Sequence, residues 1–376
     1  MRIMYVNDAF AIKGGIERVL ADKINYLSSV YGYDICLLTA NQGTHPHAYR
    51  LDPSVKYVDV GISFHNLYRY HGIKRWIKTR EYDRLFLQRV CQQIDAFCPD
   101  IIITARPFYL KPLCRLKNKA LLILESHSSC RNAYFEEDSS FKRLLEIWQI
   151  KKLKKLPMMV IALTDGDACE WHKLLPQYGV KVIPNIVAFN DSKNEGVQEC
   201  KRIIFVGRLE YQKGLDDLIK VWEQVQRQHD DWQLDIYGDG SQKARLQSVI
   251  QERKLHVNLW GSVDRISECY MRSSMLLLTS VYEPFGLVMP EAMSCGLPVV
   301  AFDCPYGPAD IITDGVDGFL IKNRDVKAFA DRVCQLIEDR ELRQRMGQTA
   351  IQSAQRYAPE RIMPLWKELF ESLPCK

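Results

Sequence analysis

The stretch of this sequence with the clearest chemical potential runs from Glu283 to Glu291 and reads Glu-Pro-Phe-Gly-Leu-Val-Met-Pro-Glu. Its two carboxylates lie on either side of Gly286 and of a predicted helix start near Leu287. A helix N-terminus presents backbone N–H groups and a positive dipole end, which together bind phosphate. One carboxylate can then accept hydrogen bonds from a sugar and the other from a ribose. Alternatively, Glu283 only caps the helix and Glu291 is a surface acid.

A second stretch places two cations, Arg208 and Lys213, on one loop between Gly207 and Gly214. This loop follows a predicted strand. Two fixed cations can neutralise the negative charge that develops on a diphosphate leaving group, without help from a metal ion. The alternative is that both are ordinary solvated surface cations.

The first half of the chain carries two weaker signals. Gly14-Gly15 follows the first predicted strand and opens a helix, which suits a loop near phosphates but also an ordinary turn. His127 ends another predicted strand, directly after Glu125-Ser126. Open α/β sheets bind ligands at the carboxyl ends of their strands, so His127 is a candidate site residue. A lone histidine can equally be structural.

The elements that must position these residues alternate along the whole chain, as expected for parallel sheets with crossover helices. In the first half, strands are predicted at residues 3–6, 35–39, 56–60, 101–104, 121–124, 159–163 and 181–184. In the second half, they are predicted at 202–206, 233–237, 257–260, 275–279, 298–301 and 318–321. Helices are predicted at 16–31, 83–97, 214–228, 241–254, 288–295, 326–338 and 359–373.

A polar stretch at residues 191–198 separates the two runs of strands and marks a domain boundary. The chain is long enough for two domains of about 100–200 residues each. We therefore predict an α/β protein with two doubly wound, Rossmann-like domains that face a cleft. The first would cover residues 1–186 and the second residues 187–359, and a last helix at 360–376 would pack back onto the first.

The order of these motifs resembles the family-4 retaining glycosyltransferases, which have the GT-B fold. The resemblance is carried by Gly-Arg-x4-Lys-Gly, a Gly-x-Gly turn, Glu-Pro-Phe-Gly-x4-Glu and Cys-Gly-x-Pro-Val-Val. In this sequence the four motifs lie at 207–214, 238–240, 283–291 and 295–300. The Pro-Tyr-Gly-Pro form at 305–308 resembles members that build bacterial surface polysaccharides and lipid-linked oligosaccharides.

The resemblance implies a nucleotide-sugar donor site in the second domain. Arg208 and Lys213 would hold the diphosphate, Glu291 would bind the ribose, and Glu283 would bind the sugar. His127 would lie beside the transferred sugar and joins Glu283, Arg208 and Lys213 as a catalytic residue. The remaining implied donor-binding residues are Gly14, Gly15, Gly207, Gly238, Gly240, Ser262, Val263, Phe285, Gly286, Leu287 and Val288.

The resemblance also implies an activity. A hexose or N-acetylhexosamine would move from a nucleoside-diphosphate sugar to a glycan or lipid-linked acceptor in surface polysaccharide synthesis, with retention of configuration. Uridine and guanosine diphosphates both fit the contacts, and we expect UDP. The leaving phosphate would take the acceptor proton, so no protein base, metal or other cofactor is expected.

The net charge of +5 is concentrated in two stretches of the first half, at residues 69–84 and 142–155. Residues 141–156 have the pattern of an amphipathic basic helix, which can lie on an anionic bilayer. A core-facing helix with a solvated lysine face explains the same pattern. Residues 68–84, which include Trp76, can likewise touch lipid or a polyprenyl diphosphate.

These features together indicate a cytoplasmic enzyme that binds peripherally to the inner face of the cytoplasmic membrane. The 12 cysteines lack metal-ligand spacing, which indicates a reducing compartment and no zinc site. A pI of about 8.5 and no recognised motif argue against nucleic acid. Two alternatives stay open: a nucleotide-sugar epimerase of the same fold, and a non-catalytic nucleotide-sugar-binding protein.

Overall fold

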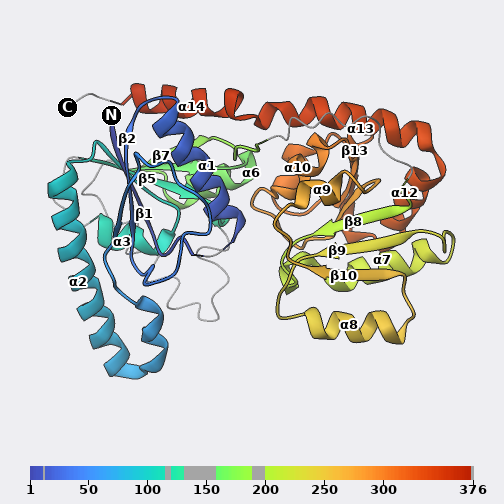
Figure 1. The fold of residues 1–376 in the computed structure, drawn as a ribbon, viewed down its shortest axis with the longest axis horizontal. Helices are drawn as coiled ribbons and strands as arrows, with labels where there is room; N and C mark the ends of the chain where they lie inside the picture. The colour runs from blue at the N-terminus through green and yellow to red at the C-terminus, as the bar shows by residue number, and fades with distance from the viewer. Residues whose placement is uncertain (12, 115–119, 131–157, 189–199, 374–376) are drawn as a thin grey trace. The chain divides into compact units, whose positions relative to one another are not determined.

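The computed structural model describes residues 1–11, 13–114, 120–130, 158–188 and 200–373 of this chain. The chain divides into two compact units, Met1–Ile183 and Pro184–Lys376. Figure 1 labels many of the elements of both units. Three predictions concern how the units are joined, and they stay predictions. They are the boundary after residue 186, the cleft, and the packing of the last helix onto the first domain.

The first unit is built on one seven-stranded sheet in the order β3-β2-β1-β4-β5-β6-β7, and every pair of neighbours is parallel. Its inner strands are short apolar runs buried on both faces, as the four residues 3–6 of β1 illustrate. Crossover helices on both faces of a parallel sheet produce such continuous burial. The strands are β1 (Arg2–Asn7), β2 (Asp34–Thr39), β3 (Lys56–Asp59), β4 (Ile101–Thr104), β5 (Leu121–Ser126), β6 (Met158–Ala162) and β7 (Gly179–Val182).

Amphipathic helices connect these strands. The first of them buries Leu20, Ile24 and Leu27 at helical spacing, so one of its faces joins the core. The last one is capped by Thr164, whose hydroxyl accepts from the backbone N–H of Asp167. The helical elements are α1 (Gly15–Ser29), η1 (Phe64–Arg69), α2 (Gly72–Phe97), η2 (Pro107–Tyr109), α3 (Leu110–Leu113) and α6 (Asp165–Leu174).

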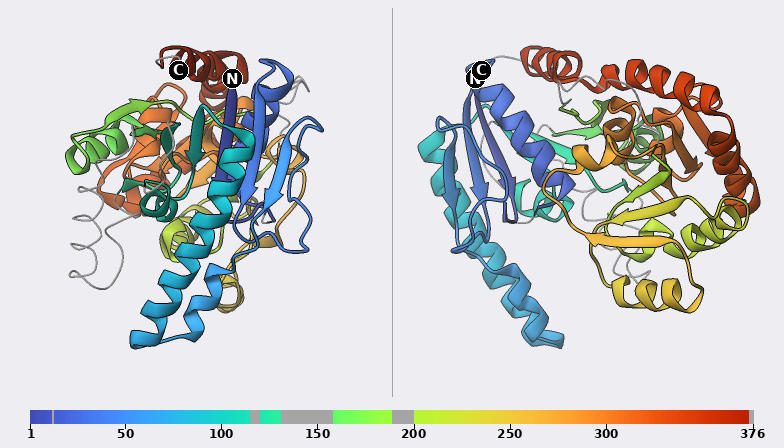
Figure 2. Two further views of the ribbon diagram at one scale, coloured as in Figure 1. Left: turned by 90° about the vertical axis from the view of Figure 1, so that its left-hand side faces the viewer. Right: turned by 45° about the vertical axis from the view of Figure 1, so that its right-hand side comes forward.

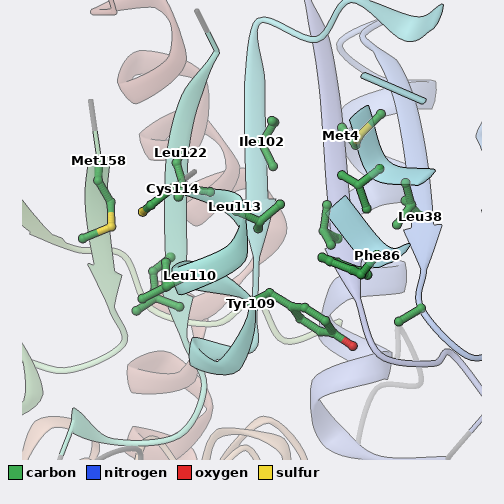
Figure 3. Packing of buried hydrophobic residues seen from close by; sticks show 14 of the residues in the cluster. Met4, Leu38, Phe86, Ile102, Tyr109, Leu110, Leu113, Cys114, Leu122 and Met158 are labelled. Atoms are coloured by element: carbon green, nitrogen blue, oxygen red, sulfur yellow. The ribbon is translucent and has the colours of Figure 1, made fainter. Parts of the chain in front are cut away.

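The core of the first unit joins strand side chains to α2 and α3, as Figure 3 shows for Met4, Leu38 and their neighbours. The rings of Phe86 and Tyr109 stack there with centroids 5.0 Å apart. The Tyr109 hydroxyl donates a hydrogen bond of 3.0 Å to Asp8, directly after β1. The core therefore also fixes the edge of the sheet at which the strands end.

The second unit repeats this plan with a six-stranded sheet in the order β10-β9-β8-β11-β12-β13, again with parallel neighbours throughout. Residues Ile203, Ile204 and Phe205 of its first strand are fully buried. The strands are β8 (Arg202–Val206), β9 (Gln233–Tyr237), β10 (Val257–Gly261), β11 (Leu276–Leu278), β12 (Val299–Phe302) and β13 (Gly318–Ile321).

Helices of the second unit pack in pairs: α7 lies against α12, and α10 lies against α13. The fully buried side chains of Trp222 and Phe329 belong to the same core cluster. The elements are η3 (Tyr211–Lys213), α7 (Leu215–Gln226), α8 (Lys243–Glu252), α9 (Ile266–Tyr270), α10 (Val288–Ser294), α11 (Gly307–Ile311), η4 (Lys322–Arg324), α12 (Val326–Glu338), α13 (Arg340–Ala354), η5 (Gln355–Tyr357) and α14 (Pro359–Glu371).

The prediction of two doubly wound parallel α/β sheets is confirmed, and every predicted strand has a counterpart. The prediction for the seventh strand was two residues too late, since β7 spans Gly179–Val182 and pairs with β6 through Val160 and Val180. Pro184 has no N–H with which to continue the ladder. The prediction for α2 began at residue 83, because its first turns bury nothing and its buried face starts at Phe86.

One long helix, α13, was not predicted. It is strongly polar, and apart from Met346 its buried apolar residues are all small, such as Ala350 and Ala354. Its start nevertheless carries a sequence signal, because Asp339 accepts a 2.8 Å hydrogen bond from the backbone N–H of Leu342.

Candidate functional site

The strand order of the second unit has one reversal point, between β8 and β11. From there the chain builds outward through β9 and β10 on one side and through β12 and β13 on the other. Loops at such a reversal point diverge and leave room for a ligand at the carboxyl ends of the strands. The two cations and the first carboxylate of the sequence motifs lie on the loops that follow β8 and β11.

These two loops are joined through their backbones. The N–H of Val281 donates to the carbonyl of Gln212 at 2.8 Å. The Thr279 hydroxyl donates to the carbonyl of Lys213 at 3.0 Å. Gly214 adopts a left-handed φ of 62°, and a Cβ there would lie 2.0 Å from the Thr279 carbonyl oxygen. Only glycine permits this approach, so the sequence pattern Lys-Gly follows from the packing of the two loops.

The side chains of Lys213 and Glu283 meet at this junction. The Lys213 ammonium donates a hydrogen bond to Glu283 Oε1. Ser280 donates a second hydrogen bond to the same oxygen at 2.7 Å. Glu283 is 4% exposed and Lys213 is 12% exposed at its side chain. Lys213 is therefore not a solvated surface cation, whereas Arg208 is exposed.

The backbone of Glu283 is fixed as firmly as its side chain. Its N–H donates to the carbonyl of Pro305 at 2.7 Å, and its carbonyl accepts from the N–H groups of Tyr306 and Gly307. Its side chain does not cap the following helix, because the N-cap position of α10 is Leu287, which has no side-chain cap. The alternative reading of Glu283 as a helix cap is thus contradicted by the structure.

The second carboxylate, Glu291, lies in the first turn of α10. It is half-buried, and the hydroxyl of Tyr270 lies 3.3 Å from its Oε2 as a hydrogen-bond donor. A hydroxyl partner already occupies one oxygen of this carboxylate, which shows that the group accepts hydrogen bonds of the type that a ribose offers. Phe285 and Gly286 lie between Glu283 and this turn.

The loops after β9 and β10 border the same edge of the sheet. The N–H of Gly238 donates to the carbonyl of Gly261 at 2.8 Å. A Cβ on Gly238 would lie 1.9 Å from the carbonyl oxygen of Gly207. The structure therefore brings the loops after β8, β9 and β10 together, with Ser262 and Val263 exposed beside them. Whether these residues bind a nucleoside stays a prediction.

In the first unit, His127 directly follows β5 and is 8% exposed. Its Nε2 lies 3.1 Å from Oε1 of Glu125, whose other oxygen pairs with Lys23 of α1. Burial raises the pKa of the Glu125 carboxyl, but the charges of Lys23 and His127 outweigh burial and lower that pKa to about 2. Glu125 is therefore an ionised, buried carboxylate that holds the histidine ring.

The glycine pair lies at the start of α1, with Gly14 at the N-cap position and Gly15 as the first helical residue. In the same turn, Glu17 accepts a 3.2 Å ion-pair contact from Arg106, which follows β4. The reversal point of this sheet lies between β1 and β4. The glycine pair thus adjoins an ion pair, Glu17–Arg106, that sequence reasoning did not single out.

A further residue without a role in the sequence analysis is Arg324 of η4. Its guanidinium donates to the carbonyls of Ser280 and Thr279 at 2.8 and 3.0 Å, and to Asp217 at the start of α7. It also stacks over the ring of Phe302 at 4.6 Å. Arg324 thereby holds the loop that carries Ser280 and Glu283. The signal that could have found it is a cation three residues after a predicted strand end.

In the described ranges, no three His, Cys, Asp or Glu side chains form a group that could hold a metal ion. No helix within those ranges is long and apolar enough to cross a membrane. The predicted basic helix at residues 141–156 lies outside the described residues.

Comparison with known proteins adds to this geometry. Residues 188–353 match the family model described as Glycosyl transferases group 1. The chain is 28% identical to the amylovoran biosynthesis glycosyltransferase AmsD of Erwinia amylovora, over 98% of this chain and 99% of that protein. It is 32% identical to the poly(ribitol-phosphate) alpha-N-acetylglucosaminyltransferase of Staphylococcus aureus, over 63% of this chain and 48% of that protein.

Solved structures share the whole fold. A crystal structure of an S. aureus TarM mutant, determined in complex with Fondaparinux, alpha-GlcNAc-glycerol and UDP, aligns with a TM-score of 0.80. The alignment covers 99% of this chain and 100% of that one at 19% sequence identity. The likeness is one of fold, and the fold is that of the GT-B enzymes.

Proposed function

Residues 188–353 match the group 1 glycosyl transferases, and on that premise we propose that the chain transfers a hexose or N-acetylhexosamine from a UDP sugar to a glycan or lipid-linked acceptor. We propose further that the reaction retains the configuration of the sugar, needs no metal, and serves surface polysaccharide synthesis. AmsD, a relative over its full length, is named for the biosynthesis of such a polymer.

The observation that carries the proposal is the pairing of Lys213 with Glu283 at the reversal point of the sheet. A diphosphate at this place would compete with the carboxylate for the lysine ammonium. The oxygens of Glu283 would then become acceptors for hydroxyl groups of the donor sugar. One pair of side chains thus offers both partners that a nucleotide sugar needs, a cation for phosphate and a carboxylate for sugar.

The neighbouring groups extend this donor site. Arg208 is exposed on the same loop as Lys213 and would add a second cation for the diphosphate. Glu291 would bind the ribose, as its contact with the Tyr270 hydroxyl suggests. The loops at Gly238 and Gly261 would border the nucleoside, and the backbone from Phe285 to Val288 would contact the sugar and phosphates.

In the proposed reaction, the bond between the anomeric carbon and the diphosphate breaks while the acceptor hydroxyl bonds to the same face of that carbon. The leaving phosphate oxygen takes the hydroxyl proton. The enzyme then acts by positioning both substrates and by stabilising the charge that develops on the phosphate. A relative whose name specifies an alpha product supports retention, because a retaining enzyme makes α-linked products from an α-linked donor.

His127 would contribute from the first unit. Oε1 of Glu125 lies 3.1 Å from its Nε2 and would help to orient the ring. The Gly14-Gly15 turn at the start of α1 would lie near the phosphates or the acceptor.

The acceptor and the location of the enzyme complete the proposal. A lipid-linked acceptor would place the reaction at the inner face of the cytoplasmic membrane, with the enzyme bound peripherally. The dense positive charge at residues 69–84 supports contact with anionic lipid.

Calorimetry of UDP, GDP, ADP and CMP binding, with and without EDTA, tests the donor site. We expect a specific, EDTA-insensitive interaction with UDP, because two protein cations replace the metal. Release of UDP from a UDP sugar only when an acceptor is present would separate transfer from epimerisation. Failure of all four nucleotides to bind, or activity abolished by EDTA, would contradict the proposal.

A further inference from the structure

The N-terminal part of α2 differs from the rest of this helix in its surroundings. Its C-terminal half buries Phe86, Val90, Ile94 and Phe97 in the core. In contrast, each of residues 72–77 is exposed. Figures 1 and 2 show this end of α2, together with η1, extending beyond the sheet of the first unit. The α2 tip, defined as residues 68–78, therefore has solvent around most of its surface.

The α2 tip carries large apolar side chains in spite of this exposure. Tyr68, Ile73, Trp76 and Ile77 are 65%, 78%, 55% and 51% exposed. The spacing of three and four residues places Ile73, Trp76 and Ile77 on one face of the helix. Solvated apolar groups of this size contribute nothing to the fold, and clustered ones mark a contact with another molecule or with a membrane.

The charge of this region identifies the kind of partner. Residues 69–84 contain six cations, namely Arg69, Lys74, Arg75, Lys78, Arg80 and Arg84, against two carboxylates, Glu81 and Asp83. The Arg80 guanidinium lies 3.8 Å from the centroid of the Trp76 ring. Apolar groups that include a tryptophan, surrounded by long cationic side chains, match the boundary between the acyl chains and the headgroups of a bilayer.

We propose that the α2 tip docks this protein on the surface of an anionic lipid bilayer. Ile73, Trp76 and Ile77 enter the headgroup boundary, and the surrounding lysines and arginines contact lipid phosphates. A second copy of this chain is a poorer partner, because two such tips would bring like charges together. This inference rests on the proposed function only in that a lipid-linked acceptor would give the enzyme a reason to reach the membrane.

Co-sedimentation of the full chain with vesicles tests the proposal. One set of vesicles contains equal parts of phosphatidylglycerol and phosphatidylcholine, and the other contains phosphatidylcholine alone. We expect binding to the anionic vesicles that weakens as salt rises from 0.1 to 0.5 M, a range over which the Debye length falls well below ~10 Å. Equal binding to both vesicle types, or none to either, would overturn the proposal.

Three variants locate the contact. K74Q/R75Q/K78Q and I73S/W76S/I77S should each lower binding to anionic vesicles by about tenfold or more, because each removes several favourable contacts with the bilayer. K201Q/K327Q/K367Q removes as many cations from exposed positions of the second unit and should bind as the unaltered chain does. An equal loss in this control would assign binding to net charge and not to the α2 tip.

UDP binding, measured by calorimetry in every variant, separates this proposal from the proposed function. Loss of vesicle binding with unchanged UDP affinity supports the α2 tip as a membrane contact. UDP binding without any vesicle binding overturns the membrane contact and leaves the donor site intact. Concentration-dependent dimerisation that the I73S/W76S/I77S variant abolishes would instead make the partner a second copy.

Discussion

Each unit contains one lysine–glutamate pair at the carboxyl ends of its strands, and the two pairs are built differently. Lys23 and Glu125 are 1% and 2% exposed, and the Tyr5 ring lies 5.4 Å from the lysine ammonium. Lys213 and Glu283 are joined by an equally direct contact, but this lysine is 12% exposed and lies on a loop.

The difference distinguishes a structural charge pair from one that, in the proposed function, a ligand would separate. Lys23 lies on the buried face of α1, so it cannot leave Glu125 without leaving the core. Burial lowers the pKa of Lys23, and Glu125 opposes that change, so each charge depends on the other. In the proposed donor site, Lys213 would turn from Glu283 to a phosphate, because its loop follows the carboxyl end of β8.

The largest expected effect comes from breaking the interior pair. Glu125→Leu leaves Lys23 buried without a counter-charge and should cost about 3–5 kcal/mol in the free energy of unfolding. Urea denaturation measures this cost. The double variant Lys23→Met/Glu125→Leu should recover most of the loss. If Glu125→Leu lowers the free energy of unfolding by less than about 1 kcal/mol, the interior pair is not the structural charge pair described here.

The loop pair should respond in turnover more than in stability. Lys213→Ala or Arg208→Ala should lower turnover by about 10²–10³, by analogy with the loss of one donor to a developing oxyanion. Steady-state rates with a UDP sugar, together with urea denaturation, test both parts of this prediction. Lys327→Ala, which removes an exposed lysine of α12, is the matched control. Near-normal turnover in both site variants would contradict the proposed donor contacts.

A change at Arg324, which holds the loop that carries Glu283, should have a smaller effect on turnover. Arg324→Lys keeps the charge but loses the fork that holds the carbonyls of Thr279 and Ser280, so turnover should fall by about tenfold. UDP affinity should change little, because the guanidinium lies behind the loop. Arg332→Lys is the control, since Arg332 also stacks on a phenylalanine ring but contacts neither loop. An equal change in both variants would mean that Arg324 only stabilises the fold.

The smallest effect is a gradual dependence on pH. The pKa of Glu125 is about 2, below the ordinary value of 4.5. A carboxyl whose pKa is lowered in the folded state adds stability above its unfolded pKa, and this stability is lost as pH falls toward the folded pKa. The unfolding free energy of the unaltered chain, measured relative to that of Lys23→Met/Glu125→Leu, should therefore fall as the pH drops from 6 to 3.5. A constant difference would contradict an ionised Glu125.

Much of this molecule could be predicted from sequence. The strands are apolar runs between turn residues, and their order gives two parallel sheets, so the predicted GT-B fold is confirmed. The predicted resemblance to glycosyltransferases is confirmed for residues 188–353, which match the group 1 family model. The motif residues of the second unit lie together because they follow neighbouring strands, although their roles stay predictions.

The long-range contacts that hold the site residues of the two units could not be predicted in the same way. Lys23 lies on a helix, where a lysine is usually solvated, and its partner is 102 residues away. Arg324 and Asp217 are 107 residues apart. Neither pairing follows from local periodicity, because only the packing of distant segments brings the charged groups together. The α2 tip shows the converse, since the exposed first turns of α2 have no buried face whose periodicity could predict a helix.

The tight approach at two glycines has a consequence for anyone who would retune this protein by directed evolution. At Gly214 and Gly238 an added Cβ would lie within about 2 Å of a carbonyl oxygen, so substitutions there displace the backbone itself. In a mutant library designed to change the donor sugar, most substitutions at these two positions would therefore disturb the fold. Exposed neighbours such as Tyr211 and Ser262 offer diversity without that displacement, and selection should begin with them.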